Sequence, residues 1–259
     1  MLVVDNSPGD KDTEKVAREY SASYVVEPGQ GLSRARNRGL AESSSDIIAY
    51  VDDDAAPEPD WLGIILSPFE DEKIAVSTGR VITPESHSDK SDHESVRVLS
   101  NKDPKWFEIA TFGGLGLGGN MALRKAACLG LNVFDERLGR GAPLHIGEET
   151  YAYARLISRG YSAVYIPSAV VFHPSLRRDS LEVEARNSIA YCLLLFSEFP
   201  DRRLDLLRFV FRRLRRERLS WPRQDQEPGE IITSSWRLKL KAGISGTLLF
   251  LRTKKPKRA

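Results

Sequence analysis

Three consecutive carboxylates, Asp52, Asp53 and Asp54, are the residues of this chain whose types and spacing point most directly to chemistry. They follow the apolar run IIAYV at residues 47–51, which predicts a buried strand. Because side chains alternate in a strand-like segment, Asp52 and Asp54 can point together into a cleft while Asp53 points away. A cation would relieve their mutual repulsion, and such oxygen ligands suit Mg²⁺ or Mn²⁺ shared with a diphosphate. A solvated turn or a helix cap explains the triplet without a ligand.

The elements around the triplet predict an α/β fold with a mostly parallel central sheet. Apolar strand-like runs alternate with helical patterns, the strands at residues 2–5, 24–26, 47–51 and 74–83 and the helices at residues 13–22 and 32–42. This alternation requires crossover connections between parallel strands. Ligands gather at the carboxyl ends of such strands, where Asp5 and the aspartate triplet fall.

The second part of the chain predicts a long loop, a helix and two strands. Residues 84–103 are polar and predict a surface loop, and the stretch GGLGLGGN at residues 113–120 is too glycine-dense for a helix. A helix is expected over residues 149–159, and a strand pair at residues 164–166 and 170–173.

The segment from Arg202 to Arg218 combines positive charge with an apolar stripe. It carries eight arginines against Asp205 and Glu217. Four of its apolar residues share one helical face: Leu207, Val210, Phe211 and Leu214. Helices of this kind lie in the interface of an anionic membrane. The alternative is that the stripe packs on the rest of the protein while the arginines are solvated.

The composition is that of an ordinary globular protein and gives no reason to expect a nucleic-acid partner. Of 259 residues, 41% are hydrophobic and 29% are charged, and the formal net charge is only +2. Cys128 and Cys192 lack metal-ligand or redox spacing, as expected of reduced thiols in the cytoplasm. The sequence shows no secretion signal at its start and no apolar run of about 18 residues. We therefore expect a cytoplasmic protein, located at the inner face of the membrane if its basic helix binds lipid.

Two stretches of the chain resemble glycosyltransferase family 2. GLSRARNRGLAESSSDIIAYVDDDAAPEPDWL is similar to the donor-binding half of that family, and NMALRKAACLGLNVFDERLGRGAPLHIGEETYAYARLISRGYSAVYIPSAVVFHP is similar to its acceptor half. The resemblance covers roughly residues 2–178. It implies a GT-A fold, a nucleotide-diphosphate sugar donor, a divalent cation (Mg²⁺ or Mn²⁺) and usually inversion at the anomeric carbon. The acceptor would be a glycan, a lipid-linked molecule or a small molecule, as in polysaccharide biosynthesis.

On the donor side, the resemblance assigns Asp5 to the nucleotide base and places Arg36 and Asn37 on the donor-side helix, with Arg36 near the base or the diphosphate. Asp52, with Asp53 beside it, would contact the ribose side. Without a ligand, Asp5 would form an Asx turn in DNSPG and Arg36 would lie on a solvated helix face.

The resemblance assigns the divalent cation to Asp54, together with Asp52 and with His173, which ends a strand in VVFHP. The cation would neutralise the charge that grows on the leaving diphosphate. If it binds no ligand, His173 is a structural histidine.

The stretch GEETYAYARL matches the family's Gly-Glu-Asp signature, in which the second acid commonly takes the proton of the acceptor hydroxyl. That acid is Glu149 here, but the residues after it depart from the signature, so the base remains open between Glu149 and Glu148. Both acids would also suit a helix N-terminus without a catalytic role. On the acceptor side, Gly119 and Asn120 resemble a pocket-lining segment, and Arg155 would pair with an acid or phosphate, or simply pack.

We expect a catalytic domain over residues 1–178, with a donor half at about 1–83 and an acceptor half at about 106–178. Residues 179–259 would form a helical, basic region with a disordered tail. Family members normally begin with a strand and helix that precede the strand at residues 2–5, so we expect an incomplete opening of the fold, from a misassigned start codon, a truncated gene or a degenerate copy.

The main functional hypothesis is thus sugar transfer by an enzyme. The alternative is a non-catalytic relic that binds sugar nucleotides or glycans. A nucleotidyltransferase is disfavoured, because its glycine- and lysine-rich opening motif is missing from the sequence.

Overall fold

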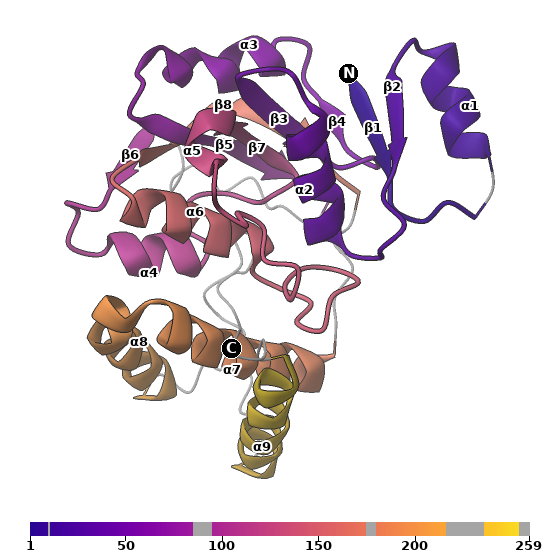
Figure 1. Ribbon diagram of the computed structural model, residues 1–259. Coiled ribbons are helices and arrows are strands. Elements are labelled where there is room, and N and C mark those ends of the chain that lie inside the picture. Colours follow the sequence, from indigo (N-terminus) through magenta and orange to yellow (C-terminus); the bar gives the residue numbers. More distant parts are fainter. Residues whose placement is uncertain (10, 85–94, 175–179, 216–235, 254–259) are drawn as a thin grey trace.

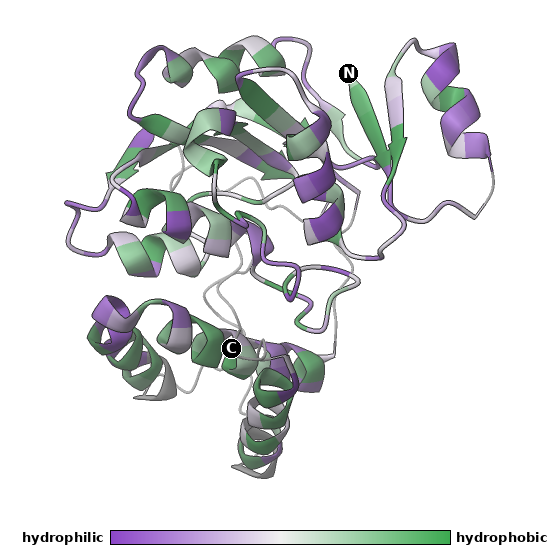
Figure 2. Cartoon of the chain, in the orientation of Figure 1, coloured by the Kyte–Doolittle hydropathy of each residue, from purple (hydrophilic) through white to green (hydrophobic). Residues whose placement is uncertain are grey.

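A computed structural model describes residues 1–9, 11–84, 95–174, 180–215 and 236–253. Its centre is a six-stranded sheet with the order β3 (Ile47–Val51), β7 (Asn120–Arg124), β5 (Ile74–Ile82), β8 (Ser162–Phe172) and β4 (Ala56–Pro57), in which β6 (Arg97–Ser100) also pairs with β8. Its strands are rich in hydrophobic residues (Figure 2). Buried apolar side chains cover both of its faces, in keeping with a central layer between helices.

The central sheet is mixed, so the expectation of a mostly parallel sheet is wrong for this part of the fold. Only β5 and β8 pair in parallel. Strand β7 lies between β3 and β5 and runs antiparallel to both, and β4 and β6 run antiparallel to β8. The reason is topological: β7 enters the sheet between two strands of the first half of the chain and reverses the direction there.

A smaller unit stands beside the central sheet (Figure 1). Strands β1 (Leu2–Asp5) and β2 (Ser23–Val26) form a two-stranded parallel sheet, connected by α1 (Asp12–Glu19). Among the described strands, β1 pairs with β2 alone. The helix α2 (Leu32–Glu42) lies against β1 and leads the chain into β3.

The other helices of the first 160 residues are short, apart from the last. They are α3 (Trp61–Leu66), the 3₁₀ helix η1 (Ser67–Glu70), α4 (Trp106–Thr111), α5 (Lys125–Cys128) and α6 (Glu148–Ser158). The predicted helix at residues 149–159 is thus confirmed as α6, and Gly160 after it adopts a φ of +95°.

Two sequence expectations need correction. The polar segment at residues 84–103 is not all loop, because β6 forms an edge strand within it. The expected strand pair near residues 164–173 is one continuous strand, β8, whose pairing with β5 shifts register between Gly79 and Arg80. A bulge inserts extra residues without ending a strand. In the sequence it interrupts the strand pattern, so one strand is predicted as two.

The C-terminal region is helical where the structure describes it, with α7 (Leu181–Glu198), the 3₁₀ helix η2 (Pro200–Arg202), α8 (Arg203–Arg215) and α9 (Trp236–Thr253). Tyr191, Leu194 and Leu206 belong to the same buried cluster as Phe134 and Tyr153. The hydrophobic core therefore continues across the expected boundary at residue 178. None of the described helices combines the length and the apolarity that a membrane crossing requires.

Candidate functional site

The aspartate triplet meets His173 at one end of the central sheet. Asp52 and Asp54 lie in the turn between β3 and β4, and β4 pairs with the end of β8, where Ala56 lies opposite Phe172. This pairing brings the turn beside His173, the residue after β8. The imidazole Nε2 lies 3.1 Å from Asp54 Oδ1 and 3.6 Å from Asp52 Oδ2. One ligand atom from each of the three residues lies within 4.8 Å of the others.

The tautomer of His173 makes this group suited to a cation. Its Nδ1 lies 2.6 Å from the carbonyl oxygen of Pro174. A carbonyl oxygen only accepts, so Nδ1 carries the proton and, in the neutral ring, Nε2 presents its lone pair to the carboxylates. Acceptors that face one another gain from a divalent ion between them, and a backbone carbonyl commonly orients a metal-binding imidazole in this way. The three residues therefore fit a divalent cation.

Asp53 points elsewhere, as side-chain alternation predicts. It lines a cavity of about 420 Å³ together with Met1 and Val3 and with residues of α1. Asp53 is therefore no part of the Asp52, Asp54 and His173 group.

Arg36 joins the cation group to the start of α6. Its side chain is 6% exposed, and its guanidinium lies 2.9 Å from Glu148 Oε1 and 3.6 Å from Asp52 Oδ1. The guanidinium also lies over the ring of Phe134, 5.8 Å from its centroid. Arg36 is thus the shared counter-ion of Asp52 and Glu148. It is buried, so it does not lie on a solvated helix face.

Glycines let these charged groups approach the backbone. A Cβ at Gly119 would lie 2.6 Å from Asp52 Oδ2, and one at Gly118 would lie 2.8 Å from both terminal nitrogens of Arg36. A Cβ at Gly139, where φ is +90°, would lie 3.1 Å from the carboxyl carbon of Glu148. At Gly118 and Gly119, the absence of a Cβ lets charged side chains pack directly on the backbone, which explains part of the glycine-dense stretch at residues 113–120.

The two acids at the start of α6 differ in their surroundings. Glu148 is buried and paired with Arg36. Glu149 is partly exposed, and within the described residues no basic side chain lies at ion-pair distance from its carboxyl group. Burial, and then the neighbouring charge of Glu148, raise the pKa of Glu149 to about 8, although the Arg36 guanidinium acts in the opposite direction. A carboxyl group of this kind exchanges protons near neutral pH, as a general base must.

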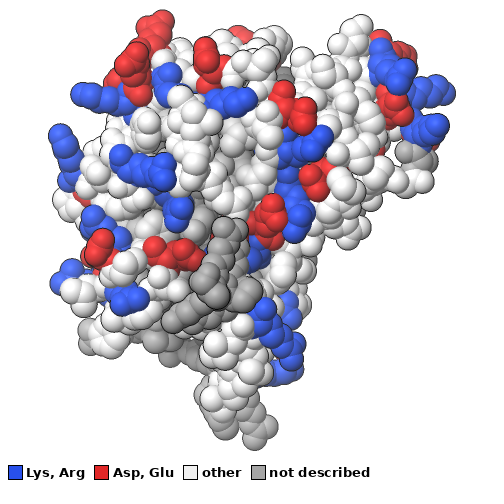
Figure 3. All heavy atoms as spheres, in the orientation of Figure 1, with Lys and Arg blue, Asp and Glu red and all other residues white. Residues whose placement is uncertain are grey.

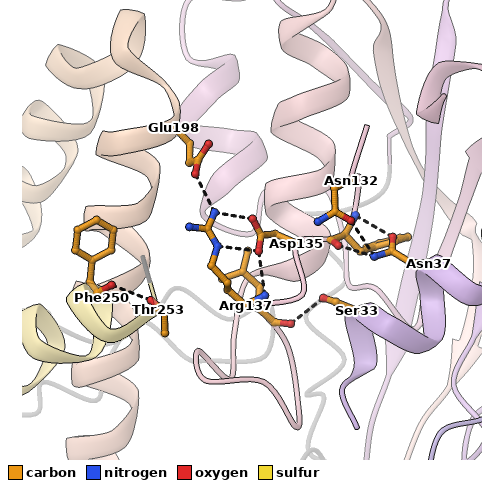
Figure 4. Close-up of polar contacts among 10 residues, drawn as sticks. Ser33, Asn37, Asn132, Asp135, Arg137, Glu198, Phe250 and Thr253 are labelled. Atoms are coloured by element: carbon orange, nitrogen blue, oxygen red, sulfur yellow. Dashed lines mark hydrogen bonds and ion pairs between the residues drawn. The ribbon is translucent and has the colours of Figure 1, made fainter. Parts of the chain in front are cut away.

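Asn37 uses its amide within the framework. Its Nδ2 donates to the carbonyl oxygen of Phe134 at 2.8 Å and to Asn132 Oδ1 at 3.2 Å (Figure 4). These bonds hold the loop after α5 against α2. The amide of Asn37 is therefore engaged in contacts within the protein, and its predicted place on the donor side stays a prediction.

The same loop is fixed at its other side by Arg137, a residue without a recognisable motif in the sequence. Figure 4 shows Arg137 between Asp135 and Glu198 of α7, at 2.6 Å and 2.8 Å. Ser33 of α2 donates to the carbonyl oxygen of Leu138 at 2.7 Å. The loop that carries Gly139 is thus clamped between α2 and α7.

Asn120 is likewise part of the framework. It is fully buried, its Oδ1 accepts from Trp61 Nε1 at 2.8 Å, and its Nδ2 donates to the carbonyl oxygens of Arg80 and Ala169. The backbone of the neighbouring Gly119 lies against Asp52. Arg155 lies two turns beyond Glu148 on α6, with its guanidinium 5.8 Å from the ring centroid of Tyr151.

Asp5 forms the Asx turn that the sequence predicts for it in the absence of a ligand. Its Oδ1 accepts from the backbone N–H of Ser7 at 3.0 Å, and its Oδ2 accepts from the hydroxyl of Tyr24 at 2.7 Å. Each carboxylate oxygen retains capacity for another donor, so the turn is compatible with a nucleotide contact.

Comparisons with known proteins agree with this architecture. The family model described as "Glycosyl transferase family 2" matches residues 1–128. Over 183 residues the chain is 26% identical to the glucosyl-dolichyl phosphate glucuronosyltransferase of Haloferax volcanii, covering 67% of this chain and 58% of that protein. It is 25% identical over 183 residues to the glycosyltransferase AglE of the same organism, covering 68% and 56%. The chain thus spans little more than half the length of these curated relatives.

Among solved structures, the mannosyltransferase PcManGT from Pyrobaculum calidifontis, in complex with GDP-Man and Mn²⁺, matches with a TM-score of 0.55 at 13% identity. The match covers 98% of this chain and 66% of that one. It confirms the expected GT-A fold. The family match thus places residues 1–128 of the chain in glycosyl transferase family 2, a family of transferases.

Proposed function

We propose that this protein transfers a sugar from a nucleotide-diphosphate sugar to an acceptor hydroxyl, with inversion and with the help of a divalent cation. The observation that carries the proposal is the juxtaposition of the Asp52, Asp54 and His173 group with the acids of α6 through Arg36. The guanidinium of Arg36 lies between a cation site and a carboxyl base. This arrangement suits a displacement in which the cation stabilises the departing diphosphate and the base takes the proton of the acceptor hydroxyl.

Asp52, Asp54 and His173 would hold Mg²⁺ or Mn²⁺. When bound, the ion supplies Lewis-acid stabilisation to the departing diphosphate. Gly119 keeps the backbone close to Asp52, and Pro174 fixes the ring of His173, so both ligands are oriented before a donor arrives.

Glu149 would be the base. Its carboxylate takes the proton of the acceptor hydroxyl as that oxygen bonds to the anomeric carbon, while the bond from this carbon to the diphosphate breaks and the nucleoside diphosphate departs. One direct displacement inverts the anomeric carbon. Glu148 is held in its ion pair with Arg36 and so serves to position that residue.

Asp5 remains our proposal for the nucleotide base, and Gly119 and Arg155 for the acceptor side. A lipid-linked acceptor is our first proposal, because one of the relatives is named for its action on glucosyl-dolichyl phosphate. A glycan or a small molecule is the other acceptor class that we propose to test. A cytoplasmic protein at the inner face of the membrane would meet such lipid-linked acceptors.

A panel of nucleotide-diphosphate sugars tests the proposal. Each donor is incubated with the full chain, with Mn²⁺ or with a chelator, and release of the nucleoside diphosphate is measured by chromatography. Cation-dependent release from at least one donor supports transferase chemistry. Saturable donor binding without any release, with or without added acceptors, supports the non-catalytic relic instead.

A further inference from the structure

Helix α9 exposes an apolar stripe along one face. Leu240, Ile244, Leu248 and Leu251 are 56%, 57%, 49% and 56% exposed. Their spacing of four, four and three residues places them on one side of a helix. Scattered exposed apolar residues are common on proteins, but four in a row on one helix form a continuous patch.

The packing of α9 fixes this stripe outward. The opposite face of α9 lies on α7 through Ala242 and Gly246, both buried. A Cβ at Gly246 would lie 2.7 Å from the carbonyl oxygen of Arg186 and 2.8 Å from Ile189 Cβ. The helix therefore docks through its small residues, and turning the larger stripe toward α7 would clash with that backbone.

The C-terminal sequence that contains the stripe is rich in positive charge. Residues 236–259 contain eight lysines and arginines and no acidic residue, so their formal charge is +8. Residues 202–218 carry a formal charge of +6. Because the net charge of the whole chain is only +2, the rest of the chain carries −12. In Figure 3 the projecting end of the molecule, where Figure 1 places α9, shows uncharged surface bordered by Lys and Arg. Lys241, on α9, is 66% exposed at its side chain and pairs with Glu182 of α7 at 2.8 Å. Arg252, near the end of α9, is exposed.

Helix α8 contributes less than its sequence suggests. Leu207 and Phe211 are exposed, as a binding stripe requires, but Val210 packs on the core and the side chain of Leu214 lies outside the described residues. Two of its arginines contact the rest of the protein: Arg203 lies over Phe196, and Arg212 pairs with Glu108. Arg202, which ends η2, lies over Trp106. The expected stripe is thus divided between packing and exposure, and α9 has the more continuous exposed face.

We infer that the stripe of α9 docks on an anionic lipid surface, with its apolar residues at the level of the acyl chains and its lysines and arginines among the headgroups. Charge complementarity selects this occupant. Each basic residue near such a surface adds attraction, and an apolar stripe beside basic residues is the pattern of interfacial helices. A second copy docked through the same face would bring two segments of formal charge +8 together, which opposes dimer formation.

Vesicle flotation of the full chain tests this inference independently of catalysis. The vesicles contain either phosphatidylcholine alone or equal parts of phosphatidylcholine and phosphatidylglycerol. The test variant combines Ile244→Glu and Leu248→Glu. The control variant combines Leu62→Glu and Leu129→Glu, which are 51% and 65% exposed on the body of the protein and change the net charge equally.

Wild type and control should float with the anionic vesicles and remain behind with the neutral ones. The α9 variant should partition about ten-fold less, because two apolar groups no longer enter the lipid. High salt should weaken the binding of wild type. Circular dichroism and size-exclusion chromatography establish that each variant is folded. Equal flotation of test and control variants would overturn the inference, as would wild-type dimers that dissociate in the α9 variant without any lipid binding.

Discussion

Arg36 and Glu148 form a buried ion pair at 2.9 Å, and this pair separates the roles of two adjacent glutamates. Glu148 is bound to the guanidinium, whereas Glu149 has its pKa raised to about 8, chiefly by burial. Of the two acids that the sequence left open, Glu149 is therefore the one suited to accept a proton.

Glu149→Gln should lower the rate of sugar transfer by roughly 10²-fold or more and leave donor affinity unchanged, because only a general base is lost. Steady-state rates and donor titrations check both halves of this expectation. Glu148→Gln is the matched comparison. If it gives the larger loss in rate with normal donor affinity, the two glutamates must exchange roles.

The pH dependence of kcat/KM should rise to a plateau with a midpoint near pH 8, since Glu149 acts only when deprotonated. The stability should change in the opposite sense. A folded-state pKa above the unfolded value of 4.5 means that stability falls as pH rises from about 4.5 to 8. Urea unfolding at several pH values should show this fall in the wild type and a smaller one in Glu149→Gln. A midpoint near pH 4.5 in the rate profile would contradict the assignment.

Arg36→Leu should destabilise the fold by about 3–5 kcal/mol, because it leaves Glu148 buried without its counter-ion. Combining it with Glu148→Leu should recover part of this loss, since the unpaired charge is then removed. Chemical denaturation of the two single variants and the double variant measures the coupling. Additive losses would show that the pair is not energetically coupled.

Gly119→Ala should weaken cation binding while the protein stays folded, because the added Cβ would lie 2.6 Å from Asp52 Oδ2 and must displace that carboxylate. Gly63→Ala is the control, since a Cβ there meets nothing within 4 Å. Calorimetric titration with Mn²⁺ in the presence of a nucleoside diphosphate compares the two. Equal affinities would remove Gly119 from the site.

Much of the fold could be predicted from the sequence because its signals are local. Apolar runs and helical spacing placed α2 and β3 at their observed bounds, and the polar residues that follow β3 and β8 proved to be neighbours. The strand directions could not be predicted in this way. Whether β7 enters the sheet parallel or antiparallel depends on contacts far apart in the chain, which periodicity does not encode.

The contacts of the polar side chains within the protein could not be predicted, because identical motifs can face a ligand or the framework. Asn37 and Asn120 stand in family-like motifs, yet their amides bind backbone carbonyls and neighbouring side chains. Arg137 and Gly139 had no local signal, since their partners lie on α7 and at the start of α6. A glycine with positive φ is detectable from sequence only when its turn is already known.

The most direct test of the account is the affinity of the protein for Mn²⁺, measured by calorimetry with a nucleoside diphosphate present, in wild type, Asp54→Ala and Asp53→Ala. Asp54 lies 3.1 Å from His173 in the proposed cation site, whereas Asp53 lines a separate cavity. Both substitutions remove one carboxylate from the same turn, so they change local charge equally. Asp54→Ala should abolish measurable Mn²⁺ binding, whereas Asp53→Ala should retain most of it. Unchanged affinity in Asp54→Ala, or an equal loss in both variants, would contradict a metal-dependent transferase with Asp54 as a ligand.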